Sequence, residues 1–77
     1  MTRNEELIAE LIHAAIDETD RQAVGRNSAR ALRALPGIIS NIMLLAMDLG
    51  AYSVEVKKKL DRAEFDARQK AHEAKGA

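Results

Sequence analysis

The sequence predicts an all-α fold: a small helical hairpin or bundle of three to four helices forming a single domain over residues 1–77. Ala, Leu, Arg, Glu and Lys dominate the composition, and these residues favour helices. Aromatic residues are limited to Tyr52 and Phe65. A chain of 77 residues is close to the size, roughly 70–80 residues, below which a single core rarely suffices. We therefore expect homodimerisation to complete the bundle.

The first helix is expected from about residue 4 to about residue 24. Thr2 or Asn4 can cap its start, and Glu5 stands three residues after Thr2, as a capping box requires. Apolar residues then recur at helical spacing on one face: Leu7, Ile8, Leu11, Ile12, Ala15 and Ile16. The pattern frays near Gly25.

A second segment is expected over 28–35, with Ser28 near its cap. Because a single glycine inside a helix costs only about 1 kcal/mol, the alternative is one long, bent helix that runs through Gly25. Pro36 is the strongest predicted break, since it removes a backbone donor and disfavours helical geometry at Leu35.

The central helix is expected over 37–49, and most of the large aliphatic side chains lie in it or just beside it. Ser40, Asn41 and Asp48 give it only a narrow polar edge, so several surfaces must cover it. A bilayer span needs about 20 residues, which makes this stretch too short to cross one. We expect a buried core helix and no membrane span.

The final helix is expected over 53–74, followed by a frayed tail at 75–77. Gly50 suits the end of the central helix and Ser53 the start of the last one. The alternative is a helix that continues through Gly50. Val56, Leu60 and several alanines form its inner stripe, and Phe65 falls on the opposite side.

The charge distribution is uneven although the net charge is zero. Residues 1–20 carry one basic and six acidic residues, a sum of −5, whereas residues 21–62 carry eight basic and three acidic residues, a sum of +5. A neutral chain is a poor candidate for bulk nucleic-acid binding. The polarity favours an acidic helix packing against a basic one, within or between chains.

The motifs that carry chemistry are weak. Glu10 and His13 have the spacing of carboxylate-bridged metal sites, but these sites need a second such motif pointing into the core. The serines lack a convergent histidine and acid, and no cysteine is present. We therefore expect no enzyme, no cofactor and no metal, and we interpret His13 and His72 as exposed helix residues.

Partner binding is predicted for Arg26, Arg30 and Arg33, which recur on one helix face, together with Phe65 and Tyr52. The competing interpretation pairs the arginines with Asp17, Glu18 and Asp20, or with a second protomer. The core of the expected oligomer comprises seven aliphatic residues: Leu35, Ile38, Ile42, Leu45, Leu49, Val56 and Leu60.

These residues favour a small cytoplasmic regulator, an inhibitor or adaptor that occupies a surface of a larger protein. The alternative is a dimeric nucleic-acid-binding regulator that uses Arg26, Arg30 and Arg33 with Lys57–Lys59. Two further hypotheses are a membrane-surface protein that uses residues 38–49 and a metal-binding bundle that uses His13.

Overall fold

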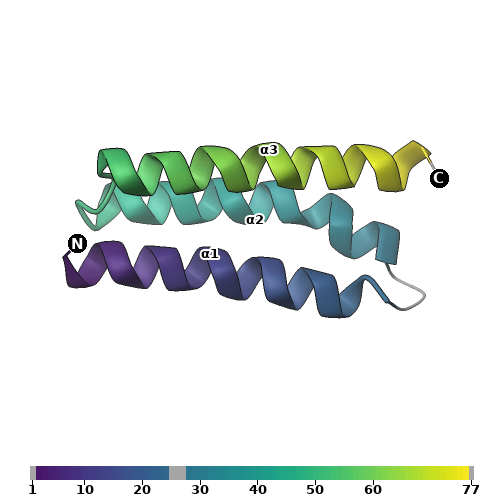
Figure 1. Ribbon diagram of the computed structural model, residues 1–77, viewed down its shortest axis with the longest axis horizontal. Helices are drawn as coiled ribbons and strands as arrows, with labels where there is room; N and C mark the ends of the chain where they lie inside the picture. Colours follow the sequence, from purple (N-terminus) through teal and green to yellow (C-terminus); the bar gives the residue numbers. More distant parts are fainter. Residues whose placement is uncertain (1, 25–27, 77) are drawn as a thin grey trace.

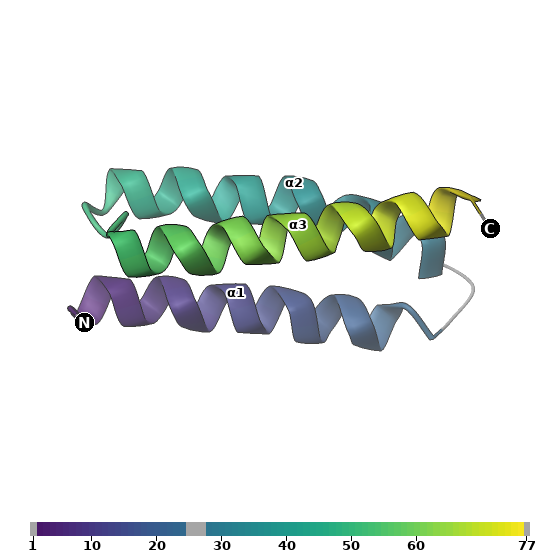
Figure 2. The same cartoon turned by 45° about the horizontal axis from the view of Figure 1, so that its top comes forward.

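A computed structural model describes residues 2–24 and 28–76 of the chain. These residues form three helices, α1 (Arg3–Gln22), α2 (Ser28–Asp48) and α3 (Val54–Gly76), and no strand occurs among them. Each helix runs antiparallel to the next one in the sequence, and together they form an elongated bundle of 39 × 18 × 16 Å (Figure 1). In both cartoon views α2 and α3 lie side by side (Figures 1 and 2). The predicted all-α fold is confirmed.

The start of α1 confirms the predicted capping box. The Glu5 backbone N–H donates to the Thr2 hydroxyl at 3.2 Å, and the Thr2 N–H donates to the Glu5 carboxylate at 3.3 Å. The helix ends at Gln22, and α2 begins at Ser28. The alternative of one continuous helix through this region is therefore wrong, although Gly25 itself lies outside the described residues.

The predicted break at Pro36 is wrong. The expected segments 28–35 and 37–49 form one helix, α2, with Pro36 inside it. Proline removes a single donor and bends a helix without having to end it. The N-terminal part of α2 bends toward α1 (Figures 1 and 2). Packing of Leu35 and Ile39, both 1% exposed, on either side of the proline supports the continuous helix.

The end of α2 confirms Gly50 as a helix terminator. Gly50 has a φ of +66°, in the left-handed region that glycine adopts without a Cβ clash. Its N–H donates to the Met47 carbonyl at 3.1 Å, and the Ala51 N–H donates to the Ala46 carbonyl at 2.8 Å. This pair of hydrogen bonds is a Schellman motif, with buried Ala46 and Ala51 as its apolar contact.

One end of the bundle is held by polar contacts between helices. Ser53 caps α3 by accepting from the Val56 N–H at 3.2 Å, as predicted, and its hydroxyl donates to the Glu5 carboxylate at 2.9 Å. The Asn4 side-chain amide donates to the Leu49 carbonyl at 3.3 Å. At the other end, Lys70 and Asp20 form an ion pair at 3.4 Å.

The core is thin. Its large buried side chains are Ile8, Ile12, Leu35, Ile39, Ile42, Val56 and Leu60, and its small ones are Ala46, Ala51, Ala63 and Ala67. Four partly buried residues, Ala15, Ile16, Met43 and Tyr52, pack against them. Thr19 is also buried, which the sequence analysis did not anticipate. Of the three helix pairs, α2 and α3 share the most extensive contact in the bundle.

Candidate interaction surface

Large apolar side chains are more often exposed than buried in this chain. Seven of those described are buried, and nine are exposed: Leu11, Val24, Ile38, Leu44, Leu45, Met47, Leu49, Val54 and Phe65. Single exposed apolar residues are ordinary, but a group on one element marks an interaction surface. Five of the nine belong to α2 or directly follow it.

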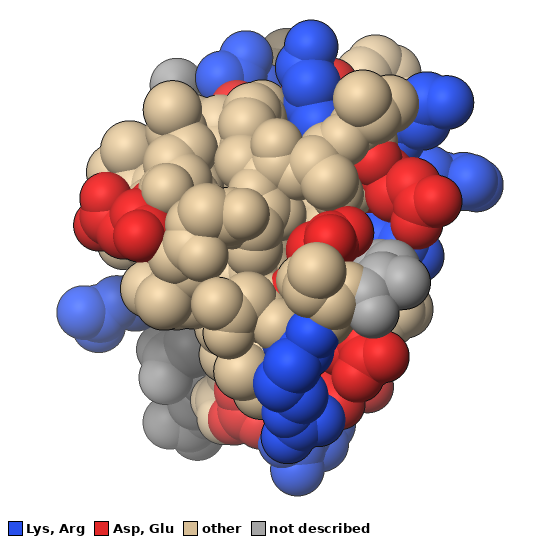
Figure 3. Space-filling view, turned by 90° about the vertical axis from the view of Figure 1, so that its left-hand side faces the viewer, with Lys and Arg blue, Asp and Glu red and all other residues tan. Residues whose placement is uncertain are grey.

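We call these five the α2 outer face, and they are Ile38, Leu44, Leu45, Met47 and Leu49. Leu44 and Met47 are more than half exposed, at 55% and 54%. Counting about 100° per residue, Leu44 lies opposite the buried side of the same helix, Met47 lies on one flank of that side, and Ile38, Leu45 and Leu49 lie on the other. The buried side holds Leu35, Ile39, Ile42 and Ala46. Uncharged residues also cover much of the bundle end formed by the N-terminus and the α2–α3 turn (Figure 3). The turn itself contributes Leu49 to the α2 outer face.

The residues predicted to form an oligomer core divide into two groups. Leu35, Ile42, Val56 and Leu60 are buried within the single chain. Ile38, Leu45 and Leu49 remain 40–41% exposed. A single chain therefore covers the first group by itself and leaves the second group partly open to another surface.

Charged residues occupy the two ends of the same side of α2. Arg30 and Arg33 are exposed near its start, and Asp48 is exposed at its last residue. Counting about 100° per residue, these three residues lie within about 60° of one another, and Leu44 falls inside the same arc. Arg26, the third predicted arginine, lies outside the described residues. Sequence reasoning noted this arginine stripe but did not connect Asp48 with it.

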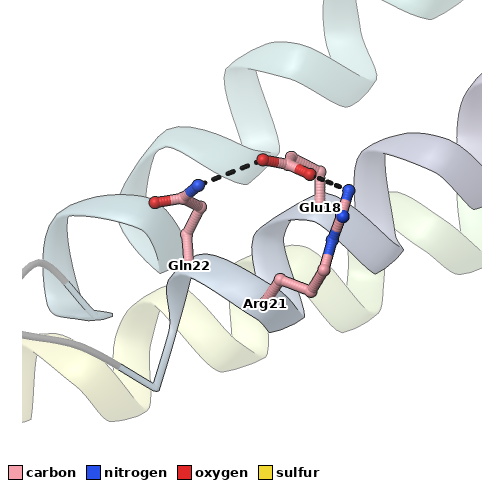
Figure 4. Close-up of polar contacts among 3 residues, drawn as sticks. All are labelled: Glu18, Arg21 and Gln22. Atoms are coloured by element: carbon pink, nitrogen blue, oxygen red, sulfur yellow. Dashed lines mark hydrogen bonds and ion pairs between the residues drawn. The ribbon is translucent and has the colours of Figure 1, made fainter.

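The predicted pairing of the arginines with the acidic end of α1 does not occur among the described residues. Glu18 instead pairs with Arg21 and accepts a hydrogen bond from the Gln22 amide at 3.0 Å (Figure 4). Asp20 pairs with Lys70. Arg33 donates to the Ala29 carbonyl at 3.3 Å, within its own helix. The competing interpretation of these arginines, pairing with a second protomer, remains a prediction.

The two aromatic residues have different environments. Tyr52 is half-buried in the α2–α3 turn and packs against the core. Phe65 is 68% exposed on α3, on the side away from the core. Val54, 71% exposed, lies on the same side of α3 by helical spacing.

The basic residues of the nucleic-acid hypothesis do not form one surface. Lys57–Lys59 are three successive exposed residues of α3, so their side chains point in different directions around the helix. Lys59 lines a groove between α1 and α3. Arg30 and Arg33 lie near the opposite end of the bundle, because α2 and α3 are antiparallel. The arrangement lacks the continuous basic stripe typical of phosphate recognition.

The groove between α1 and α3 has a volume of about 340 Å³. Ile12, Ile16 and two alanines make its apolar floor, and His13, Lys59, Arg62 and Asp66 make its charged edge. His13 is exposed, but it faces this groove rather than open solvent on the far side of α1. No group of three or more His, Asp or Glu side chains converges among the described residues.

Among the described residues, the carboxyl group whose pKa is clearly perturbed, that of Glu5, has a structural role. The Ser53 hydroxyl donates to Glu5 and, with the backbone hydrogen bond from Thr2, lowers the pKa of the Glu5 carboxyl below its usual value. This group joins α1 to the start of α3.

By length and composition alone, α2 would be able to cross a membrane, and 22% of its most apolar 18-residue stretch is buried. The expectation of no span rested on a helix confined to 37–49. That premise is wrong, because α2 extends back to Ser28. Soluble core helices pass the same test, so the finding does not discriminate between the two.

No family model, curated protein or solved structure is significantly similar to this chain.

Proposed function

We propose that the protein is a small, non-enzymatic regulator that acts by occupying a surface of another protein. The observation that supports this role is the excess of exposed over buried large apolar side chains, nine against seven among the described residues. A chain that exposes more large apolar side chains than it buries offers apolar surface that a partner can cover.

The α2 outer face is the surface we assign to this role. Its aliphatic and methionine side chains offer apolar area, and methionine adapts to partners of irregular shape. Arg30, Arg33 and Asp48 flank it, which matches the apolar centre and polar rim of protein interfaces. Helix faces of this kind bind in grooves or against other helices.

Phe65 offers a second, smaller contact on α3. An exposed aromatic side chain contributes a large contact area at low cost in conformational entropy. It lies on a different helix from the α2 outer face, so one chain would be able to use both contacts together.

A comparison of two charge substitutions tests the role of the α2 outer face. Leu44→Asp places a carboxylate in this face, and Val54→Asp places one at a more exposed apolar position on α3. Both variants should keep the helicity of the wild type. Chemical cross-linking in native lysate, followed by mass spectrometry, should detect a protein partner that Leu44→Asp loses and Val54→Asp retains. An identical cross-linking pattern for all three proteins would contradict the assignment.

A further inference from the structure

We infer that the α2 outer face is covered by the same face of a second copy, in an antiparallel, two-fold symmetric dimer that brings Asp48 of each chain beside Arg30 and Arg33 of the other. The inference concerns the same α2 outer face as the proposed function, so a larger protein that binds this face competes with the second copy. The inference goes further by naming the occupant and the register.

Charge complementarity is the first argument. The exposed side of α2 is basic near its start and acidic at its end, with the apolar residues between them or beside Asp48. An antiparallel copy places each acidic end against a basic start, whereas a parallel copy places like charges together. Among the described residues Asp48, Arg30 and Arg33 have no ion-pair partner within the chain.

The helix dipole gives an independent argument. A helix is stabilised by acidic residues in its first turn and basic residues in its last turn, and α2 has neither. Instead Arg30 stands in its first turn and Asp48 ends it, so both charges oppose its own dipole. In an antiparallel pair, the carboxylate of Asp48 lies within two turns of the start of the partner helix and close to the partner's Arg33, whose charge compensates it. The unfavourable arrangement within one chain becomes favourable between two.

Shape selects a register. With the two-fold axis beside Asn41, Leu44 lies beside the partner's Gly37 and Leu45 lies beside the partner's Ile38, each within one residue of the same level. The space where a Cβ of Gly37 would lie is open for at least 4 Å, so the facing leucine has room to enter. The same register brings Asp48 level with the partner's Ala34, next to Arg33 and one turn from Arg30.

The exposed area fits a dimer of this size. The chain has an accessible surface of 5421 Å². A compact monomer of 8.5 kDa is expected to expose about 4,650 Å², so the excess is about 800 Å². A standard interface buries about 800 Å² on each partner.

Sedimentation equilibrium of the full chain, from about 5 to 200 μM, tests the assembly directly at concentrations that span micromolar dissociation constants. We expect a species of twice 8.5 kDa. Leu44→Asp should weaken dimerisation by more than about 100-fold while the far-ultraviolet circular dichroism spectrum stays helical, and Val54→Asp should leave it unchanged. A monomer at 200 μM would overturn the inference, as would a Leu44→Asp variant that still dimerises.

A charge-exchange experiment tests the register. Asp48→Arg alone and the pair Arg30→Asp with Arg33→Asp should each weaken the dimer by about tenfold, through repulsion across the interface. The triple variant should regain affinity to within about threefold of the wild type, because the complementary pattern is restored in reverse. Additive losses in the triple variant would rule out this antiparallel arrangement.

These outcomes separate the two proposals. A wild-type monomer whose cross-linked partner is lost in Leu44→Asp would overturn the dimer and leave the proposed function standing. A dimer with no other protein bound would support the inference and contradict a role on a larger protein.

Discussion

The helices α2 and α3 have similar lengths, 21 and 23 residues, but different kinds of residue on their exposed sides. Each contributes four buried residues to the core: Leu35, Ile39, Ile42 and Ala46 from α2, and Val56, Leu60, Ala63 and Ala67 from α3. Outside the core, α3 carries charged residues interrupted by Val54 and Phe65, whereas α2 carries the α2 outer face.

The difference shows which helix has an outer side suited to water and which has apolar side chains left uncovered. The outer side of α3 is suited to water as it stands, because charged side chains are well solvated there. α2 is apolar on most of its circumference, and only the side toward α1 and α3 is covered. Substitutions on the covered side of α2, on its open side and on α3 should therefore have different effects on folding and assembly.

The largest effect is expected on the covered side of α2. Ile39→Asp places an unpaired carboxylate at a position that is 1% exposed, and it should destabilise the fold by more than about 4 kcal/mol. Thermal unfolding followed by circular dichroism should show no cooperative transition. A variant that melts like the wild type would show that α2 does not form the centre of the core.

A substitution on the open side should have a different result. Leu45 belongs to the oligomer core predicted from the sequence, and in a fully buried core a carboxylate would abolish folding or assembly. Because Leu45 is 40% exposed, we now expect assembly to be lost and the helical fold to survive. Circular dichroism and light scattering on the same sample separate these effects. Loss of both helicity and the dimer mass would mean that the open side also stabilises the fold of the single chain.

The start of α3 should give a moderate effect that depends on pH. Ser53→Ala removes the cap of α3 and the hydroxyl that hydrogen-bonds Glu5, and it should cost about 1 kcal/mol at neutral pH. The pKa of Glu5 is lowered in the folded chain, so its contribution is present at neutral pH and is lost as the pH falls through that lowered pKa.

The difference between wild type and Ser53→Ala should therefore shrink in acid. Parallel urea titrations at neutral and acidic pH measure it, with Ser40→Ala on α2 as the control. An equal difference at both pH values would indicate that the cap alone, and not the contact with Glu5, accounts for the effect.

The smallest effect on stability is expected at Phe65. Phe65→Ala should change the free energy of unfolding by less than about 0.5 kcal/mol, because the ring is 68% exposed. It should also leave the dimer intact while weakening binding to a larger protein. A drop in dimer mass would place Phe65 in the self-association interface instead.

Local signals predicted the helix ends well. The capping box of Thr2 and Glu5, the left-handed Gly50 and the Ser53 cap all depend on neighbours within a few residues, and each is confirmed. Pro36 was mispredicted for the opposite reason. Its local preference was outweighed by packing of α2 against α1 and α3, which a single sequence does not display.

The candidate surface was only partly predictable. Helical periodicity identified Ile38, Leu45 and Leu49 together with Ile42, but it did not separate the one that a single chain buries from the three that it leaves partly exposed. That division depends on where α1 lies across α2. The significance of Asp48 also required the whole of α2 as one helix, since only then do Arg30 and Asp48 mark its two ends.

The most direct test of the central claim is the solvent accessibility of individual methyl groups in solution. A soluble paramagnetic agent relaxes exposed methyl protons, and nuclear magnetic resonance of the wild type at high concentration would compare Leu44 with Val54. A single chain exposes both, at 55% and 71%. We predict strong relaxation at Val54 and weak relaxation at Leu44, because a second copy covers the latter. Equal relaxation at both would contradict the account.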